Sequence, residues 1–338
     1  MAATRILVLK QEGLRQFVEA EPAFAAIRAA NPKATIDLLT TPTFGRLAKG
    51  APYFDRVLAA GQFEGKAAQK EFVSQIRKMH YSDVYDLDGS RMSLELKTAL
   101  KGFRGPRWVG PKKVMVKTSK PGGSGLTAPA LRKLLHDANL PLEPRLPSLE
   151  WAFAARKEAA NMQPSWFGIS GPFALFLPAA APEKRWPAFH YARVAQALAQ
   201  EGLKSVLIGD ESLSPFALDV AQQASHAGQD AASGMVVDLT GKADLAQVAM
   251  LAKHAHFFIA GASEELHLCV SVGCSGIVLL HPSAEAEAES LFGRDVIKMV
   301  AQDMSKLSPE MTLMMLRNMG LLQASQGALK ADQAYHIA

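Results

Sequence analysis

A segment near the C-terminal end of the chain places several chemically useful side chains within a short space. Residues 257–268 read FFIAGASEELHL, which is an apolar run followed by a short loop and then by His267. This pattern predicts a strand, a loop and the start of a helix, where exposed backbone N–H groups favour phosphate. Glu264 and Glu265 stand at that point, where they would repel an anion or would instead cap the helix. The segment therefore predicts an anion-binding architecture with an unfavourable local charge.

Three polar residues could contact a phosphate group, and each has a structural alternative. Lys184 could neutralise a diphosphate leaving group through its charge, or it could be an ordinary surface lysine. Ser263 could donate to a phosphate, or it could be the N-cap of the next helix. His267 could bind the same group, or its ring could form a hydrogen bond with a neighbouring residue. The pair Trp186 and Pro187 is typical of packing and of a first helical turn.

Two carboxylates are candidates for proton transfer. Glu12 and Asp88 both follow apolar runs, and a positioned carboxylate can serve as a general base. For each of them the alternative is a solvated loop charge. Cys269 and Cys274 lie on one apolar segment, which predicts packed free thiols in a reducing compartment rather than a metal or redox pair. No cluster with metal-ligand spacing is recognisable, so the sequence predicts neither a metal nor another cofactor.

The formal net charge of the chain is +5, which weakly favours an anionic partner. Six basic residues gather in one segment of the first half: Arg104, Arg107, Lys112, Lys113, Lys117 and Lys120. This cluster predicts either a solvated loop or a basic rim that faces an acidic acceptor or a membrane surface. Trp108 is the one aromatic residue within the cluster. The aromatic residues are therefore not interleaved with the basic ones, which argues against binding of nucleic acid.

Alternating strands and helices must position these residues. In the first half, short apolar runs predict strands at residues 5–9, 35–40, 57–58 and 83–87, with helices at 22–30, 44–49, 66–79, 92–100 and 131–138. The second half predicts strands at 173–177, 205–209, 236–239, 257–260 and 276–280, with helices at 188–201, 215–227, 245–254, 265–272 and 309–319. Such alternation indicates parallel sheets with helices on both faces. In the last helix, helical spacing predicts a core stripe of Met311, Met314, Met315 and Met319.

This organisation predicts an α/β protein with two Rossmann-like, doubly wound domains that face a central cleft. The expected domains are residues 1–160 and 161–322, followed by a flexible tail at 323–338. In open parallel sheets the ligand lies beyond the carboxyl ends of the strands. The sequence contains no run of about 20 apolar residues and no signal-peptide core. A cytoplasmic protein is therefore expected, with peripheral contact to the inner membrane as a further expectation.

Several segments together have the order and spacing of a known family. In the first half these are ILVLK at residues 6–10 followed by Pro22-Ala23, and the segments 40–44, 51–57 and 85–91. In the second half they are KRWP at 184–187, DLTGKADL at 238–245, and His267 with Gly273. The chain resembles glycosyltransferase family 9, the bacterial heptosyltransferases of lipopolysaccharide cores.

The resemblance implies the GT-B fold and an inverting, metal-independent transfer from a nucleotide-activated sugar. An ADP-sugar is the expected donor. The expected acceptor is a cell-envelope glycolipid or glycan, and a glycolipid acceptor would be anionic. Nucleotide-sugar binding is then predicted at Lys184, Ser263, His267 and Ser283. Acceptor binding is predicted at Arg91, Arg104 and Arg107.

The chain departs from the family pattern at the positions that carry chemistry. By the resemblance, residues 10–16 form the loop after the first strand, and Gln16 aligns with the catalytic aspartate that ends this loop in the family. An amide cannot act as a base. Ala262 stands in place of the aspartate of the nucleotide-side motif. Glu12 or Asp88 would have to substitute as the base. Two functional classes remain open: a heptosyltransferase-like glycosyltransferase with degraded motifs, and a catalytically inactive relative that binds a glycan, a nucleotide or a protein partner.

Overall fold

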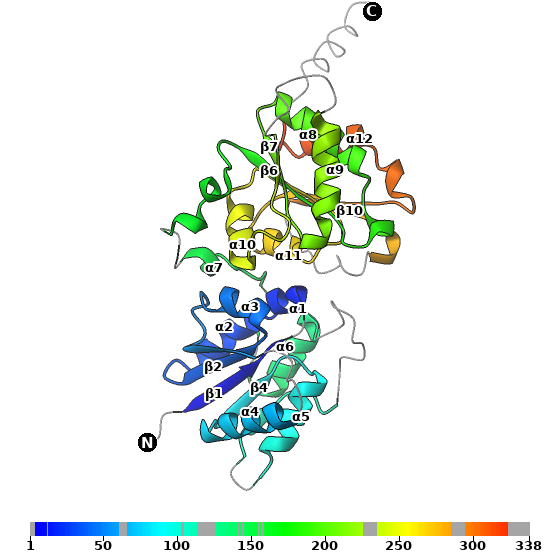
Figure 1. Cartoon of the computed structure of the whole chain (residues 1–338). Helices are drawn as coiled ribbons and strands as arrows, with labels where there is room; N and C mark the ends of the chain where they lie inside the picture. Colours follow the sequence, from blue (N-terminus) through cyan, green and yellow to red (C-terminus); the bar gives the residue numbers. More distant parts are fainter. Residues whose placement is uncertain are drawn as a thin grey trace, which may run out of the picture. The chain divides into compact units, whose positions relative to one another are not determined.

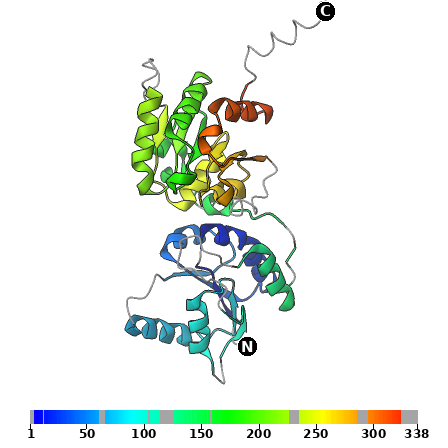
Figure 2. The same cartoon turned by 90° about the vertical axis from the view of Figure 1, so that its right-hand side faces the viewer.

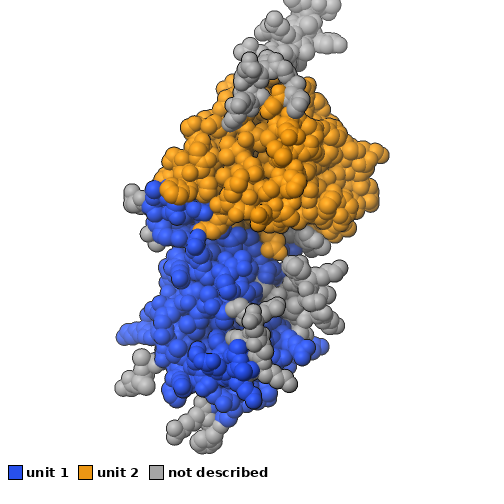
Figure 3. All heavy atoms as spheres, viewed as in Figure 1, with its two compact units in different colours: residues 1–162, 245–250 blue, residues 163–244, 251–338 orange. Residues whose placement is uncertain are grey.

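The chain folds into two compact units in the computed structural model. Unit 1 comprises residues 1–162 and 245–250, and unit 2 comprises residues 163–244 and 251–338 (Figure 3). The structure describes residues 4–11, 13–60, 66–102, 105–113, 126–140, 142–143, 145–154, 156, 159–225, 235–284 and 295–323. The expected tail therefore lies outside the described residues apart from Gln323. The division at residue 162 falls two residues after the expected domain boundary at 160.

Unit 1 is built on one five-stranded sheet in the order β3-β2-β1-β4-β5. The strands are β1 (Arg5–Leu9), β2 (Thr35–Thr40), β3 (Arg56–Ala59), β4 (Asp83–Asp86) and β5 (Arg107–Val109). Every pair in this sheet is parallel. The central strand β1 is almost wholly buried, as an apolar strand covered on both faces must be.

Helices cover both faces of this sheet (Figures 1 and 2). They are α1 (Leu14–Glu19), α2 (Glu21–Ala30), α3 (Pro42–Ala48), α4 (Lys66–Lys78), α5 (Arg91–Leu100) and α6 (Ala128–Asp137). The short helix α7 (Trp151–Ala154) also belongs to unit 1. Helices α4 and α5 pack together over a core cluster that includes Leu7, Leu9 and Val84 of the sheet. Helix α2 contacts both α1 and α6 on the opposite side of the sheet (Figure 1).

Unit 2 has a six-stranded parallel sheet in the order β11-β10-β9-β6-β7-β8. The strands are β6 (Phe173–Leu177), β7 (Lys204–Leu207), β8 (Val236–Asp238), β9 (Phe258–Ala260), β10 (Gly276–Leu280) and β11 (Val296–Val300). The helices are α8 (Ala188–Gln200), α9 (Ser214–Ser225), α10 (Leu245–His254), α11 (Leu266–Ser271) and α12 (Pro309–Asn318). Helices α8, α9 and α12 form one core cluster with the sheet, and α10 is divided between the two units. Both halves are therefore doubly wound α/β units, as the alternation predicts.

The structure corrects the expected methionine stripe of α12. Met315 and Met319 pack against the core, whereas Met311 and Met314 are 43% and 52% exposed. The four methionines share one side of the helix, but the buried side is centred on Thr312, Leu313 and Leu316, roughly 100° or more further round the helix axis. Leu313 and Leu316 occupy the face that points to the core, and the methionines lie at its edge or beyond it.

The two cysteines match the expectation of packed free thiols. Cys269 and Cys274 are both free and buried. Burial raises the pKa of the Cys274 thiol to about 12, and it also raises the pKa of the Cys269 thiol well above its ordinary value. Both groups are therefore neutral thiols at physiological pH and poor nucleophiles.

Candidate functional site

The carboxyl ends of β1 and β4 meet at one edge of the unit 1 sheet, because these two strands are direct neighbours. Lys10 follows β1 and Asp88 follows β4. Their charged atoms, Nζ and Oδ1, lie 3.7 Å apart, and both side chains are completely buried. Lys10 Nζ also donates to the backbone oxygen of Leu87 at 3.2 Å, and the N–H of Gln11 donates to Asp88 Oδ1 at 3.1 Å. This geometry favours a structural role for Asp88 over proton transfer to a substrate.

A second buried carboxylate, Asp86, holds the turn after β4. Its Oδ1 accepts from the N–H groups of Asp88, at 3.1 Å, and Gly89, at 2.8 Å. Its Oδ2 is buried and has no hydrogen-bond partner among the described residues. Burial raises the pKa of Asp86, although the hydrogen bond from Gly89 acts in the opposite direction. Asp86 therefore shapes the turn that places Asp88 against Lys10.

Gln16 lies inside a helix rather than in the loop that the sequence predicts. Helix α1 begins directly after Gly13, whose φ of 51° is left-handed and suits glycine. A Cβ atom at Gly13 would lie 1.9 Å from Gln16 Oε1, so the amide is folded tightly against this glycine backbone. Gln16 is 7% exposed, and its Oε1 has no hydrogen-bond partner among the described residues. The residue that the resemblance places at the family base position is thus both chemically inert and buried.

The predicted acceptor residues do not share one place in the sheet. Arg91 begins α5 at the carboxyl edge, where it is exposed and its Nε donates to Glu95 at 3.0 Å. Arg107 begins β5 at the opposite edge of the sheet, where its Nε donates to Asp83 at 2.5 Å. Of the two that the structure describes, Arg91 is therefore placed at the predicted edge and Arg107 is not. Arg104 and the base candidate Glu12 lie outside the described residues.

In unit 2 the loops after β6 and β9 pack against each other. A Cβ atom at Gly261 would lie 2.7 Å from the backbone nitrogen of Ala179, so only glycine allows this approach. The N–H of Gly261 also donates to Leu177 O at 2.8 Å. Lys184 ends the short 3₁₀ turn Pro182–Lys184 in the loop after β6, and its side chain is partly exposed. Lys184 and Ser263 therefore lie in loops that follow two adjacent strands, β6 and β9, at the carboxyl edge of this sheet.

The remaining predicted nucleotide contacts follow β9 and β10. The Ser263 hydroxyl donates to Glu265, so this serine binds the acidic side chain rather than capping α11. His267 lies in the first turn of α11 and is 7% exposed. After β10, the His281 ring nitrogen Nδ1 accepts from the backbone N–H of Ser283 at 3.2 Å, and it lies 2.8 Å from the Ser283 hydroxyl. Because β10, β9 and β6 are neighbours in the sheet, all these loops open at one edge.

Trp186 is a packing residue, as the sequence predicts. It is completely buried, its indole N–H donates to Leu307 O at 2.6 Å, and its ring packs edge-on against Tyr191 with centroids 4.9 Å apart. This anchors the end of the loop that carries Lys184. Pro187 stands at the N-cap of α8.

Sequence reasoning missed Arg185, which fixes the same loop. Its Nε donates to Ala179 O at 2.6 Å, a second nitrogen donates to Ala180 O, and the guanidinium lies 4.8 Å from the Phe216 ring centroid. Burial lowers the pKa of Arg185 from its ordinary value. Its position between Lys184 and Trp186 is the one signal that could have found it.

The described residues contain no group of three or more histidine, cysteine, aspartate or glutamate side chains that could hold a metal ion. Among them, too, no helix is long and apolar enough to cross a bilayer.

The geometry of the chain agrees with its relatives. Residues 71–319 match the model of glycosyltransferase family 9 (heptosyltransferase), so this chain belongs to that family. A Haemophilus influenzae protein described as a candidate glycosyltransferase is 31% identical over 77 residues, a match that spans 23% of this chain and 22% of that protein.

Solved structures of the family share the fold over nearly the whole chain. The family 9 glycosyl transferase of Veillonella parvula has a TM-score of 0.76 at 18% identity, with 95% of this chain and 98% of that chain covered. The Escherichia coli ADP-heptose lipopolysaccharide heptosyltransferase II has a TM-score of 0.72 at 19% identity, covering 95% and 99%. The E. coli heptosyltransferase WaaC, solved with ADP, has a TM-score of 0.68 at 16% identity, covering 94% and 100%. The fold is therefore of the GT-B type.

Proposed function

We propose that this chain binds a nucleotide-activated sugar, with an ADP-sugar as the best candidate, at the carboxyl edge of the unit 2 sheet. Family membership supports this proposal, as do the structures of E. coli WaaC with ADP and with ADP-2-deoxy-2-fluoro heptose. The loops of Lys184, Ser263, His267 and Ser283 open at one edge, where a diphosphate could meet a lysine charge and polar donors.

The acidic loop after β9 weakens this donor site. Ala262 offers no polar contact, Glu264 is exposed, and the carboxylate of Glu265 already accepts from Ser263. A phosphate that replaced this contact would have to approach two carboxylates, and like charges at close range oppose binding. We therefore propose that the nucleotide binds weakly and mainly through Lys184.

On this proposal, sugar transfer by the usual mechanism of the family is very slow or does not occur. The single observation that carries it is the buried amide of Gln16, which occupies the family base position against Gly13. A general base contributes roughly 100- to 10,000-fold to such a reaction. The substitute candidate Asp88 is held by Lys10 inside the unit. On this proposal the chain acts as a nucleotide-sugar-binding relative of the heptosyltransferases.

The second candidate function is an inverting, metal-independent transferase that uses Glu12 as its base. The observation in its favour is a carboxylate in the short segment between β1 and α1, next to Gly13. Its acceptor would be a cell-envelope glycolipid of the lipopolysaccharide type. The proposed location is the cytoplasm, at the periphery of the inner membrane.

Calorimetric titration with ADP, ADP-sugars, UDP and GDP tests the binding proposal. Lys184→Ala is expected to weaken ADP binding by about 1–3 kcal/mol, the contribution of a hydrogen bond to a charged group. Lys298→Ala is the matched control, because Lys298 is an exposed lysine within β11. Equal ADP affinity in the two variants would show that Lys184 does not contact the nucleotide.

Product formation from ADP-heptose separates the two candidate functions. Wild type is expected to be very slow, and Gln16→Asp alone should not produce a fast enzyme, because Ala262 and Glu264 still impair the donor loop. If wild type turns over robustly and Glu12→Gln abolishes that activity, the second candidate function is correct. Robust turnover that survives Glu12→Gln would contradict both assignments.

A further inference from the structure

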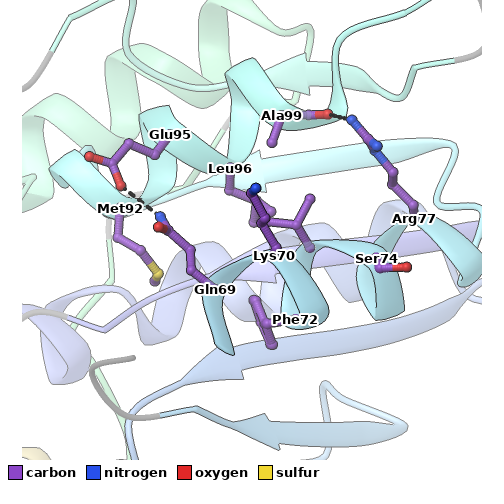
Figure 4. Close-up of a pocket in the computed structure, with 10 residues that line it drawn as sticks. Gln69, Lys70, Phe72, Ser74, Arg77, Met92, Glu95, Leu96 and Ala99 are labelled. Carbon is purple, nitrogen blue, oxygen red and sulfur yellow. Dashed lines mark hydrogen bonds between the residues drawn. The ribbon is translucent and has the colours of Figure 1, made fainter. Parts of the chain in front are cut away.

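A groove lies between α4 and α5 of unit 1, on helices that the proposed nucleotide site does not use. It encloses about 400 Å³, within the range of ligand-binding pockets. Its apolar wall consists of Phe72, Val73, Met92, Leu96 and Ala99. Figure 4 shows Lys70 between the two helices, above this wall. The groove is therefore apolar inside and cationic at its mouth.

Side-chain hydrogen bonds bridge the groove at both ends (Figure 4). At one end Gln69 Nε2 donates to Glu95 Oε2 at 3.0 Å, and at the other Arg77 donates to the backbone oxygen of Ala99. The two bridges begin eight positions apart on α4, which corresponds to about 12 Å along the helix axis. A docked helix, itself about 10 Å wide, would need a longer open groove. The closed ends suit a slender chain.

The charge around the groove defines the chemistry of its occupant. Helices α4 and α5 together carry six basic and two acidic residues. One of the acidic groups, Glu95, is already bound by Gln69 and Arg91. Arg77 has five N–H donors, so it can bind an anion while it holds Ala99. An apolar interior with lysine and arginine at its rim complements an acyl chain that carries a phosphate.

We propose that the α4–α5 groove binds an anionic membrane lipid, with part of one acyl chain inside and the phosphate at Lys70 and Arg77. Basic residues near a bilayer each add attraction to anionic lipid, and buried methylene groups add hydrophobic binding. This site lies on helices that the proposed nucleotide site does not use. The inference therefore stands or falls separately from the proposed function.

Vesicle co-sedimentation of the full chain tests this proposal. One set of vesicles is phosphatidylcholine alone, and the other is an equal mixture of phosphatidylcholine and phosphatidylglycerol. Wild type is expected to bind only the mixture. Lys70→Glu and Ser74→Asp each place a negative charge at the groove, where both native residues are exposed, and each should weaken binding roughly fivefold or more.

Lys298→Glu is the control, because it makes the same change of net charge as Lys70→Glu on an exposed position of β11. Thermal unfolding of each variant verifies that it is folded. If Lys298→Glu weakens vesicle binding as strongly as Lys70→Glu does, the binding is general electrostatic attraction and the assignment of the groove as the lipid site is wrong. Failure of wild type to bind anionic vesicles, or capture of an acidic peptide by the groove in their place, would overturn the lipid assignment.

Discussion

Replacement of Asp88 by asparagine separates a structural carboxylate from a catalytic one. Asp88 and Lys10 are both completely buried, with 3.7 Å between their charged atoms. Loss of one partner of a buried ion pair leaves the other charge uncompensated and costs about 3–5 kcal/mol. Asparagine can still accept from the N–H of Gln11. We therefore expect Asp88→Asn to lower the free energy of unfolding by about 3 kcal/mol, the lower end of this range.

A double variant and a surface control sharpen this test. Lys10→Met combined with Asp88→Asn removes both charges, and it should recover most of the lost stability, because a neutral pair no longer needs compensation. Asp83→Asn is the matched control, since Asp83 pairs with the largely exposed Arg107. An exposed pair contributes only about 0–1 kcal/mol, so this variant should unfold close to wild type.

Urea unfolding followed by circular dichroism measures all four proteins, and the slope of the transition verifies that the comparison is valid. Product formation from ADP-heptose is measured in parallel. The structural assignment fails if Asp88→Asn is as stable as wild type yet abolishes a measurable wild-type turnover. It also fails if the double variant is less stable than Asp88→Asn, because the two charges would then not compensate each other.

Two further predictions concern buried groups of each unit. Burial raises the pKa of Asp86, so at pH values between the unfolded and the folded pKa the folded state keeps a proton that the unfolded chain releases. The stability from this group is therefore present at low pH and is lost as pH rises through the folded pKa. Urea midpoints measured across pH should show wild type losing stability relative to Asp86→Asn. Parallel curves for the two proteins would show that the pKa of Asp86 is not raised in the folded state. In unit 2, Trp186→Phe removes the indole donor to Leu307 O and leaves a small cavity, which should lower the unfolding free energy by about 2–4 kcal/mol. A thermal midpoint equal to that of wild type would show that this hydrogen bond adds nothing.

Long apolar runs made most of the fold predictable from the sequence. Residues 5–9 and 173–177 form the buried strands that the sequence predicts, because a run of large apolar side chains is stable only between two covered faces. The short edge strands β5 and β11 were not predicted. β5 has three residues and β11 contains an exposed lysine, so neither has the continuous apolar pattern of a buried strand.

The local structure around Gln16 shows where pattern reasoning fails. The resemblance to the family led us to expect a loop from Lys10 to Gln16, and the short helix α1 was missed. Its first turn carries no acidic residue, and its N-cap is a glycine without a side-chain hydrogen bond. The ordinary signals of a helix start are therefore absent. The close fit between Gly13 and Gln16 depends on three-dimensional packing, which no single-sequence pattern contains.

The partners of charged side chains could not be predicted from the sequence either. Lys10 and Asp88 are recognisable as residues that follow strands, but their contact depends on β1 and β4 being neighbours in the sheet. Arg107 was grouped with a basic loop because β5 was not predicted. Its true place at the start of β5 points it to Asp83, at the edge opposite the predicted site.

The residues that maintain the fold of this chain are distinct from those expected to carry chemistry. Trp186 and Gly261 each have a packing role: a buried hydrogen bond to Leu307 and a close approach to Ala179. By the resemblance, Gln16 and Ala262 stand where the family has aspartates that would act on substrate. Replacement of those aspartates leaves the packing of Trp186 and Gly261 intact. Family membership and fold therefore do not depend on the groups that sugar transfer would need.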